Sequence, residues 1–308
     1  MSATHPRLQA LMARATAQAG TNPAALGLVY PCDALALDAA QRMAHSGMAR
    51  PVLIGPRELI AAAADAAQVD VRDFELIDSG SSAPDAALRA CALARSRDLR
   101  ALMKGSLHTD ELMAAVVNKE QGLRGTSRIS HAFVFDLPRY HKLLALADCV
   151  VNIAPDLKTK KDILGNAVDL LHKLGIAQPK VGIVAAVEVV NPSIPATLDA
   201  QALVEMAHAG TWPGAIVEGP FGFDNAFSAE AARIKKIDSQ VAGDADLLLM
   251  PDLNAGNMLY KSFNYVGGGD CAGLVLGAQV PIVLTSRADS LQSRMASVAL
   301  AVLAGAPA

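Results

Sequence analysis

Short apolar runs alternate with longer amphipathic segments along the whole chain. The short runs, such as 181–187, are apolar at nearly every position, which is typical of strands buried on both faces. The longer segments carry Ala, Leu and Met at helical spacing, as between residues 163 and 174. The pattern predicts strands at residues 26–30, 51–54, 74–77, 181–187, 215–218, 247–250, 274–276 and 281–284. It predicts helices at residues 34–45, 58–67, 86–94, 109–119, 163–174, 200–209, 229–237, 256–264 and 291–303.

Apolar strands that are separated by helices indicate parallel sheets covered by helices on both sides. We therefore expect an α/β protein with two doubly wound domains and a cleft between them. The first domain is expected to contain residues 1–140 and, because the last helix returns to it, about 280–308. The second is expected to contain about 141–279. The length of 308 residues agrees with two domains at about 150 residues each.

The composition excludes several classes of protein. Hydrophobic residues make up 52% of the chain, so a disordered chain is excluded. The 27 basic and 30 acidic residues give a net charge of −3, which disfavours non-specific nucleic-acid binding. No apolar run reaches the roughly 20 residues that span a bilayer, and the first residues lack the order of a secretory signal. We expect a cytoplasmic protein without a nucleic-acid or membrane partner.

The four cysteines lie far apart in the sequence, at Cys32, Cys91, Cys149 and Cys271. No two of them form a CxxC pair, and no histidine joins them at zinc-finger spacing. We therefore expect buried free thiols and no metal site.

Ligands of doubly wound sheets collect at the carboxyl ends of the strands, so the loops at these ends are the candidate sites. A GxxxxGK[ST] phosphate loop, a GxSxG nucleophile elbow and an HExxH zinc motif do not occur in the sequence. The signatures of nucleotide hydrolysis, serine hydrolysis and zinc proteolysis are therefore missing, and three polar loops remain.

The first loop runs from Met250 to Asn257, directly after a predicted strand and before a predicted helix. Asp252 and Asn254 can cap this helix, and a small residue at Gly256 lets a ligand approach the backbone. A helix N-terminus of this kind can hold an anion. A tight turn without any ligand is the alternative.

The second loop, residues 284–290, combines two hydroxyls, a guanidinium and a carboxylate. Arg287 can bind two phosphate oxygens at once through its planar fork. Ser286 can donate a hydrogen bond to a reacting oxygen, and Asp289 can cap the helix or accept a proton. The alternative is an ordinary helix cap beside a surface arginine.

The third loop places Lys104, His108 and Thr109 directly before a predicted helix, with Thr109 as the expected N-cap. His108 can titrate near neutrality, although a lone histidine near a cap is more often structural. The nearby cations Arg124 and Arg128 can extend an anion-binding surface, and the alternative is that each is a solvated charge.

At these loops the chain resembles the phosphate acetyltransferase and phosphate butyryltransferase family. The resemblance runs from about residue 100 to the end of the chain, and its wording is closer to the butyryl branch. The matching stretches, in family order, are LMKG (102–105), NKEQGLR (118–124), SHAFVF (130–135), VNIAP (151–155), EGP (218–220), PDLNAGN (251–257) and SRADS (286–290).

The resemblance implies reversible transfer of a short-chain acyl group between coenzyme A and inorganic phosphate, which gives an acyl phosphate by direct attack in a ternary complex. It also implies the two-domain fold of isocitrate and isopropylmalate dehydrogenases, an active site in the interdomain cleft and a homodimer. Coenzyme A is then a substrate, and neither a metal nor a tightly bound cofactor is expected.

The resemblance also implies roles for single residues. Ser286 stabilises the developing charge, and Arg287 binds phosphate or the acyl oxygen. The acetyl branch has an aspartate as the thiol base seven residues after that serine, but Ser293 stands there in this chain. Asp289 is therefore the expected base. The expected substrate-binding residues are Asp252, Asn254, Gly256, Asn257, Lys104, His108, Thr109, Arg124 and Arg128.

Two other functions stay open at this point. A β-decarboxylating dehydrogenase with the same fold needs aspartates around a divalent metal, and Asp244, Asp246 and Asp252 are the candidates. A protein that binds coenzyme A or acyl phosphate without turnover is the other alternative, because Ser293 replaces the family's base.

Overall fold

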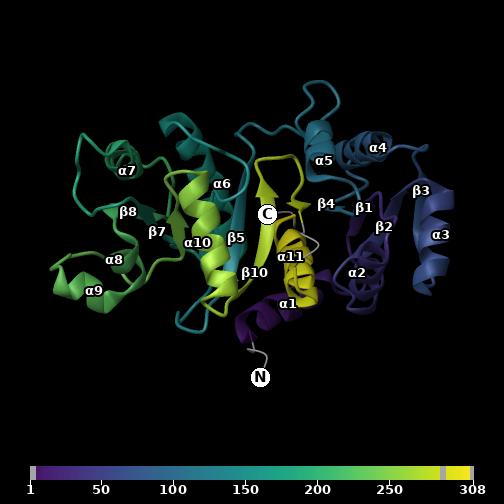
Figure 1. The fold of residues 1–308 in the computed structure, drawn as a ribbon, viewed down its shortest axis with the longest axis horizontal. Coiled ribbons are helices and arrows are strands. Elements are labelled where there is room, and N and C mark those ends of the chain that lie inside the picture. Colours follow the sequence, from purple (N-terminus) through teal and green to yellow (C-terminus); the bar gives the residue numbers. More distant parts are fainter. Residues whose placement is uncertain (1–4, 285–288, 306–308) are drawn as a thin grey trace. The chain divides into compact units, whose positions relative to one another are not determined.

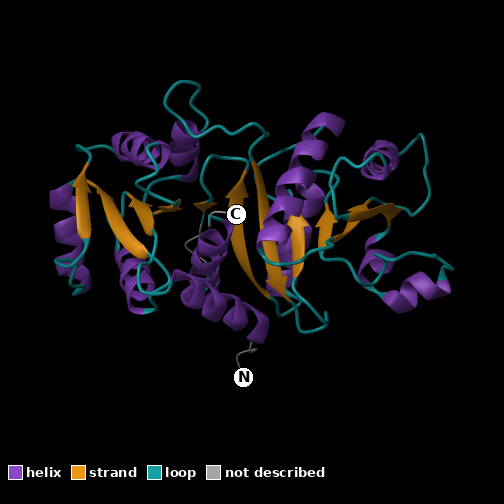
Figure 2. Cartoon of the chain, turned by 180° about the vertical axis from the view of Figure 1, so that it is seen from behind, coloured by secondary structure: helices purple, strands orange, loops and turns teal. Residues whose placement is uncertain are grey.

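The computed structural model describes residues 5–284 and 289–305, in which helices flank the strands of β-sheets (Figures 1 and 2). The chain divides into two compact units. The terminal unit consists of Leu8–Ile129 and Ala272–Ala308, and the central unit consists of Met1–Arg7 and Ser130–Cys271. The domain bounds expected from the sequence, 1–140 with about 280–308 and about 141–279, stay a prediction.

The sheet of the terminal unit is mostly parallel. β1 pairs in parallel with β2 and β4, and all five residues of β1 are buried, as the apolar runs predicted. β11 is parallel to β4 but antiparallel to β10, so the expectation of parallel strands is wrong at this pair. The strands, in spatial order, are β3 (Glu75–Asp78), β2 (Arg50–Gly55), β1 (Ala25–Val29), β4 (Ala101–Lys104), β11 (Ile282–Val283) and β10 (Asp270–Leu276), which begins in the central unit.

The helices of the terminal unit begin at local caps. The Asp33 carboxylate accepts a hydrogen bond from the Ala36 amide, and the Ser82 hydroxyl accepts one from Asp85. In α11, 11 of 14 residues are buried, because this helix is rich in Ala, Leu and Val on every side. The helices are α1 (Pro6–Ala19, whose first two residues belong to the central unit), α2 (Ala34–His45), α3 (Arg57–Ala67), α4 (Ala83–Arg95), α5 (Thr109–Val116) and α11 (Leu291–Ala304).

The sheet of the central unit is mixed. β9 pairs in parallel with β6 and β7, and β7 pairs in parallel with β8. β5 is antiparallel to β6, which again differs from the parallel sheet that the sequence predicted. The strands, in spatial order, are β5 (Ser130–Asp136), β6 (Leu144–Ala147), β9 (Leu247–Leu249), β7 (Lys180–Val184) and β8 (Ile216–Phe221).

The helices of the central unit cover its sheet and are held by apolar and ionic contacts. Alternate residues of β5 face α10, where the ring of Phe133 stacks on that of Tyr260 at 4.2 Å between centroids. The buried Lys160 ammonium of α6 binds the Asp199 carboxylate of α7 at 2.6 Å. The helices are α6 (Leu157–Lys173), α7 (Pro195–His208), α8 (Phe223–Phe227), α9 (Ala229–Ile234) and α10 (Leu253–Tyr265).

The prediction of buried free thiols is confirmed for three of the four cysteines. All four cysteines are free thiols, and three of them are buried, while Cys32 is partly exposed. No helix within the described residues has the length and apolarity to span a membrane.

Candidate functional site

The carboxyl ends of the parallel strands of the central unit meet at one edge of its sheet, where one loop follows β6 and the predicted loop 250–257 follows β9. Asp148 directly follows β6 and is 3% exposed. Its carboxylate accepts hydrogen bonds from the amides of Val150 and Val151 at 2.8 and 3.0 Å. Asp148 was not predicted as a functional residue, because the strand that it follows was not predicted either.

The second loop of this edge leads into α10, and Asp252 is its N-cap as the sequence predicted. The Asp252 carboxylate accepts a hydrogen bond from the Ala255 amide at 3.0 Å, while the Leu253 amide donates to the Ile153 carbonyl at 3.0 Å. The cap carboxylate brings its own negative charge to the helix N-terminus, where the helix dipole favours an anion. Asn254 is exposed in the first turn and does not cap the helix.

Gly256 and Asn257 contact the loop that follows β6. A Cβ atom on Gly256 would lie 2.6 Å from the Asp148 carbonyl oxygen, so glycine allows the helix to approach this loop closely. The Asn257 side-chain amide donates to the Cys149 carbonyl at 3.2 Å. The small residue was expected to let a ligand approach the backbone, but in the structure the loop after β6 takes this space.

In the terminal unit, the parallel strands β1 and β4 bring Tyr30, Cys32 and the third predicted loop to one edge. The Ser106 hydroxyl donates to the Tyr30 carbonyl at 2.9 Å and accepts from the Cys32 amide at 2.7 Å. The Lys104 ammonium donates to the carbonyls of Gly105 and Leu107 at 3.1 and 3.0 Å. This positive charge is therefore bound to carbonyls of its own loop.

The N-cap of α5 is His108, so the prediction of Thr109 as the cap is wrong. The Glu111 carboxylate accepts a hydrogen bond from the His108 backbone amide at 2.8 Å. This contact fixes the start of the helix at Thr109. The helix ends at Val116. In the turn that follows, the Asn118 side-chain oxygen accepts hydrogen bonds from the amides of Glu120 and Gln121.

Arg124 and Arg128 are exposed on the loop after α5. The Arg124 Nε donates to the Val117 carbonyl at 2.6 Å, and the backbone of Arg124 bridges to Ala278. The Gly125 amide also donates to the Gly277 carbonyl. These contacts of Arg124 and Gly125 hold the loop in place.

The loop before α11 is described only in part, because Ser286 and Arg287 lie outside the described residues. Ser290 is the N-cap of α11, and its hydroxyl accepts a hydrogen bond from the Ser293 amide at 2.9 Å. The interpretation of Asp289 as a helix cap is therefore wrong. Ser293, which stands where the acetyl branch has its base, is 7% exposed.

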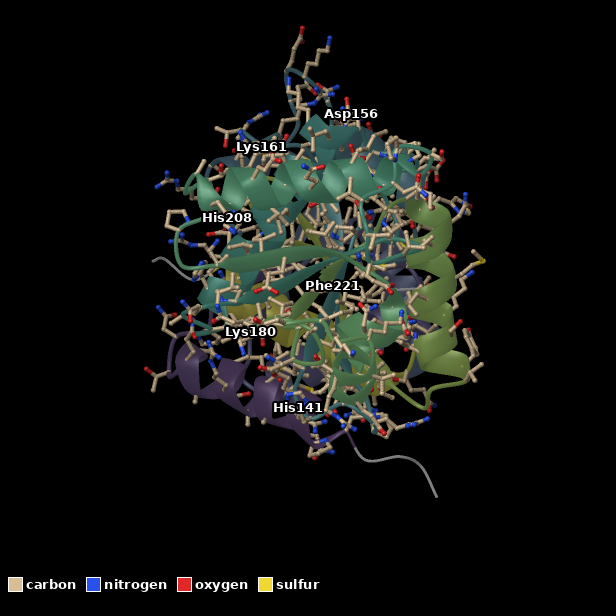
Figure 3. All side chains as sticks on the ribbon, turned by 90° about the vertical axis from the view of Figure 1, so that its left-hand side faces the viewer. His141, Asp156, Lys161, Lys180, His208 and Phe221 are labelled. Carbon is tan, nitrogen blue, oxygen red and sulfur yellow. The ribbon has the colours of Figure 1, made fainter. Side chains whose placement is uncertain are left out.

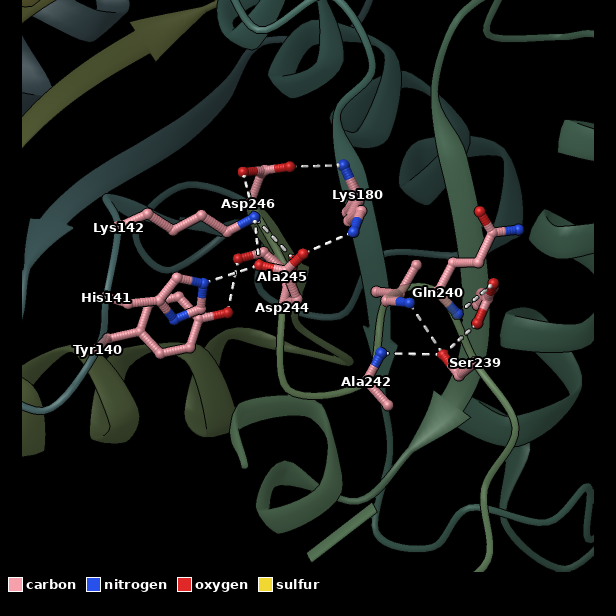
Figure 4. A network of polar contacts seen from close by, with 12 residues as sticks. Tyr140, His141, Lys142, Lys180, Ser239, Gln240, Ala242, Asp244, Ala245 and Asp246 are labelled. Carbon is pink, nitrogen blue, oxygen red and sulfur yellow. Dashed lines mark hydrogen bonds and ion pairs between the residues drawn. The ribbon is translucent and has the colours of Figure 1, made fainter. Parts of the chain in front are cut away.

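The aspartates that a metal-dependent dehydrogenase would need are engaged elsewhere. Asp244 binds Lys142 at 3.0 Å and Lys180 at 2.5 Å, and Asp246 binds Lys142 at 2.7 Å (Figure 4). Both aspartates precede β9, whereas Asp252 follows it.

In Figure 3, Lys180 and His141, which contact Asp244, lie below Asp156, which precedes α6. In the described ranges, no group of three or more His, Cys, Asp or Glu residues has the arrangement to hold a metal ion. The ion-paired aspartates therefore do not support the dehydrogenase alternative.

The ion pairs of Asp244 with Lys142 and Lys180 predict that the stability of the fold changes at acidic pH. Partial burial raises the pKa of Asp244, but hydrogen bonds from Lys180, Lys142 and His141 outweigh this effect and hold the pKa well below its usual range. A lowered pKa stabilises the fold above the unfolded value of about 3.9, and this contribution is lost as the pH falls below it.

We therefore expect the free energy of unfolding to fall less steeply between pH 5 and pH 3 in Asp244→Asn than in the parent. The difference should be about 1 kcal/mol, because solvent screens a partly exposed network. Urea unfolding at several pH values measures it, with the exposed Asp238→Asn as the control. Equal slopes for all three proteins would contradict the prediction.

The chain is similar to known proteins over most of its length. The sequence model described as phosphate acetyl/butaryl transferase matches residues 81–302. The chain is 47% identical to the phosphate acetyltransferase of Rhizobium meliloti over 293 residues, which cover 95% of this chain and 92% of that protein. It is 40% identical to the phosphate butyryltransferase of Clostridium acetobutylicum over 267 residues, which cover 87% and 88%. The short motifs resemble the butyryl branch more closely, but over most of the chain the identity to this butyryltransferase is lower than the identity to this acetyltransferase.

Solved structures agree with the fold. A branched-chain phosphotransacylase from Enterococcus faecalis superposes with a TM-score of 0.80 at 28% identity and covers 92% of this chain and 99% of its own. A 4-hydroxythreonine-4-phosphate dehydrogenase from Burkholderia phymatum superposes with a TM-score of 0.57 at 14% identity, covering 92% and 99%. The second likeness concerns the fold alone and confirms its dehydrogenase-like class. On the matched residues and the identity over most of the chain, this protein belongs to the phosphate acetyl/butaryl transferase family.

Proposed function

We propose that this phosphate acyltransferase moves a short-chain acyl group, butyryl or acetyl, reversibly between coenzyme A and inorganic phosphate. The observation that carries the function is the family match over residues 81–302, which includes the PDLNAGN and SRADS stretches. Relatives named for acetyl and for butyryl transfer both align with most of the chain, so both acyl groups are candidate substrates.

The reaction proceeds by direct attack in a ternary complex. The thiol of coenzyme A loses its proton to a base, for which we propose Asp289, and the sulfur attacks the carbonyl carbon of the acyl phosphate. A carbon–sulfur bond forms, the bond between this carbon and the phosphate oxygen breaks, and phosphate leaves with the electron pair. Ser286 stabilises the charge that develops on the carbonyl oxygen, and Arg287 binds the phosphate.

The candidate substrate-binding residues differ in how they can take part. In the terminal unit, Arg124 and Arg128 are exposed residues whose guanidinium groups suit a phosphate. The Arg124 Nε donates to the Val117 carbonyl, and the Lys104 ammonium donates to two carbonyls of its own loop. We assign the second anion contact to one of the two arginines. His108 and Thr109 at the start of α5 are proposed to contact the substrate through polar atoms.

In the central unit, the substrate contacts are proposed at the first turn of α10. Asn254 is exposed there, while Asp252, Gly256 and Asn257 hold the turn in place through the contacts described above. Asn254 is therefore the residue of this group that can reach a substrate directly.

The chain is further proposed to be a cytoplasmic homodimer that associates through the central unit. Met258 and Tyr265 stand seven residues apart on one face of α10 and are 65% and 76% exposed. They flank the exposed polar residues Lys261 and Ser262, and this mixed face is the proposed contact. Sedimentation of the purified chain is expected to show a dimer, and a monomer at micromolar concentration would overturn this assignment.

A turnover assay tests the proposed function. Acetyl phosphate and butyryl phosphate are each mixed with coenzyme A and the purified chain, and the thioester is followed by its absorbance. We expect turnover with at least one of the two acyl phosphates. Binding of coenzyme A without turnover would instead support the non-catalytic alternative, and reduction of NAD(P) by a hydroxy dicarboxylate would support a dehydrogenase.

A further inference from the structure

We propose that Asp148 is a positioning residue for the acyl transfer, because its buried carboxylate fixes the loop after β6 and, through this loop, the first turn of α10. The inference rests on the proposed function, since that turn carries the proposed substrate contacts. Asp148 does not itself touch the substrate in this proposal. It acts through the backbone of residues 149–153.

The Asp148 carboxylate is satisfied by five hydrogen bonds. Oδ1 accepts from the amides of Val150 and Val151, at 2.8 and 3.0 Å. Oδ2 accepts from the Asn152 amide at 3.3 Å, the Asn152 side-chain amide at 2.7 Å and the His131 amide at 3.2 Å. These donors are all neutral, so the loop must keep its shape to solvate a charge that is removed from water. The bonds therefore fix the loop at three consecutive residues.

The same loop contacts α10 at three points. The Ile153 carbonyl accepts from the Leu253 amide at 3.0 Å, and the Cys149 carbonyl accepts from the Asn257 side chain at 3.2 Å. A Cβ on Gly256 would lie 2.6 Å from the Asp148 carbonyl oxygen and 3.2 Å from the Cys149 sulfur. A shift of the loop thus moves the first turn of α10, and a displacement of about 1 Å at a site can cost about 10²-fold in rate.

His131 connects the carboxylate to α10 by a second route. Its amide donates to Asp148, and its ring lies edge-on to Phe133 at 4.4 Å between centroids, while Phe133 stacks on Tyr260 of α10. Burial lowers the pKa of His131 to about 4, so the ring is neutral at pH 7. His131 therefore supplies the carboxylate with an amide donor and no positive charge.

Asp148→Asn tests the proposal. The asparagine has nearly the same size, but its amide nitrogen cannot accept, so the amides on one side of the group lose their acceptor. We expect kcat/KM for coenzyme A to fall by about 10–100-fold, with most of the change in KM. A purely structural role would lower the thermal midpoint and leave the KM of the folded enzyme unchanged.

Asp136→Asn is the matched control. Asp136 is 2% exposed, lies at the other end of β5 and accepts from the Arg7 amide and guanidinium at 2.7 and 2.6 Å. This variant removes a buried carboxylate of the same unit at the end of β5 that lies near Phe263, in the last turn of α10, rather than near its first turn. It should lower the thermal midpoint and leave KM near the parent value. A KM for Asp148→Asn that matches Asp136→Asn would overturn the proposal.

Two further measurements keep the proposal falsifiable. Asn152→Ala removes one of the five hydrogen bonds and leaves the carboxylate in place, so it should raise KM in the same direction by a few-fold even if Asp148→Asn does not fold. Calorimetric binding of coenzyme A separates this test from turnover. If the parent binds coenzyme A without turnover, the proposed function fails. A Kd that is about tenfold weaker in Asp148→Asn, or a few-fold weaker in Asn152→Ala, still supports the positioning role, whereas Kd values equal to that of the parent overturn it.

Discussion

Replacement of Arg287 by alanine is expected to lower the rate of acyl transfer by about 10²–10³-fold, because we propose that the guanidinium of the SRADS stretch binds the transferred phosphate. The position rests on the sequence stretch, since residue 287 lies outside the described residues. Initial rates with acyl phosphate and coenzyme A measure this loss. Arg287→Lys should recover only part of the lost rate, because an ammonium cannot bind two phosphate oxygens in the bidentate geometry of the guanidinium.

The control for this prediction is Arg57→Ala, which removes an exposed arginine at the start of α3 in the same unit. Its turnover and its thermal midpoint should both stay near the parent values. Arg287→Ala should share the unchanged midpoint and lose only turnover. A rate close to that of the parent would remove Arg287 from the site.

Much of the fold follows from local patterns of apolar residues. The strand predicted at 51–54 is β2, and the helix predicted at 34–45 coincides with α2, where Asp33 supplies the cap. The strands at 101–104, 130–136 and 144–147 were missed. The first and the last have only three or four consecutive apolar residues, and such short runs resemble buried helix segments. The antiparallel pairing of β5 with β6 depends on contacts between segments rather than on either segment's pattern.

In the candidate site too, single residues were predicted where their role is local and missed where it depends on distant segments. Asp252 was predicted as a cap because Pro-Asp follows a buried strand, and the cap is present. The neighbour of Gly256 could not be predicted, because it is the backbone of Asp148, more than a hundred residues earlier in the chain. Asp148 itself was missed, since its role comes from amides that gather around it only in the folded loop.

The helix cap of α11 shows how neighbouring polar residues compete for one position. Both Asp289 and Ser290 have side chains that favour an N-cap, and the sequence pattern pointed to the first of them. The structure gives the cap to Ser290. Asp289 is therefore not needed to begin the helix, and a change at this residue can be separated from helix stability.

The proposed base leads to the second large expected effect. Asp289→Asn should lower turnover at pH 7 by about 10²-fold, because the amide cannot accept the thiol proton. Activity should recover partly as the pH approaches about 8.5, the ordinary pKa of a thiol, since thiolate then forms without help. The thermal midpoint should change little, because Ser290 caps α11. A pH–rate profile from pH 6 to 9 measures the effect.

Ser290→Ala is the matched control one residue further along the chain. Loss of the hydroxyl that accepts from the Ser293 amide should cost about 1 kcal/mol of stability. It should leave the ratio of its rate to that of the parent constant across the pH range. The two variants thus separate the base from the cap. If the ratio for Asp289→Asn is also flat with pH, Asp289 is not the base, and the proton leaves to another group or the coenzyme A binds as thiolate.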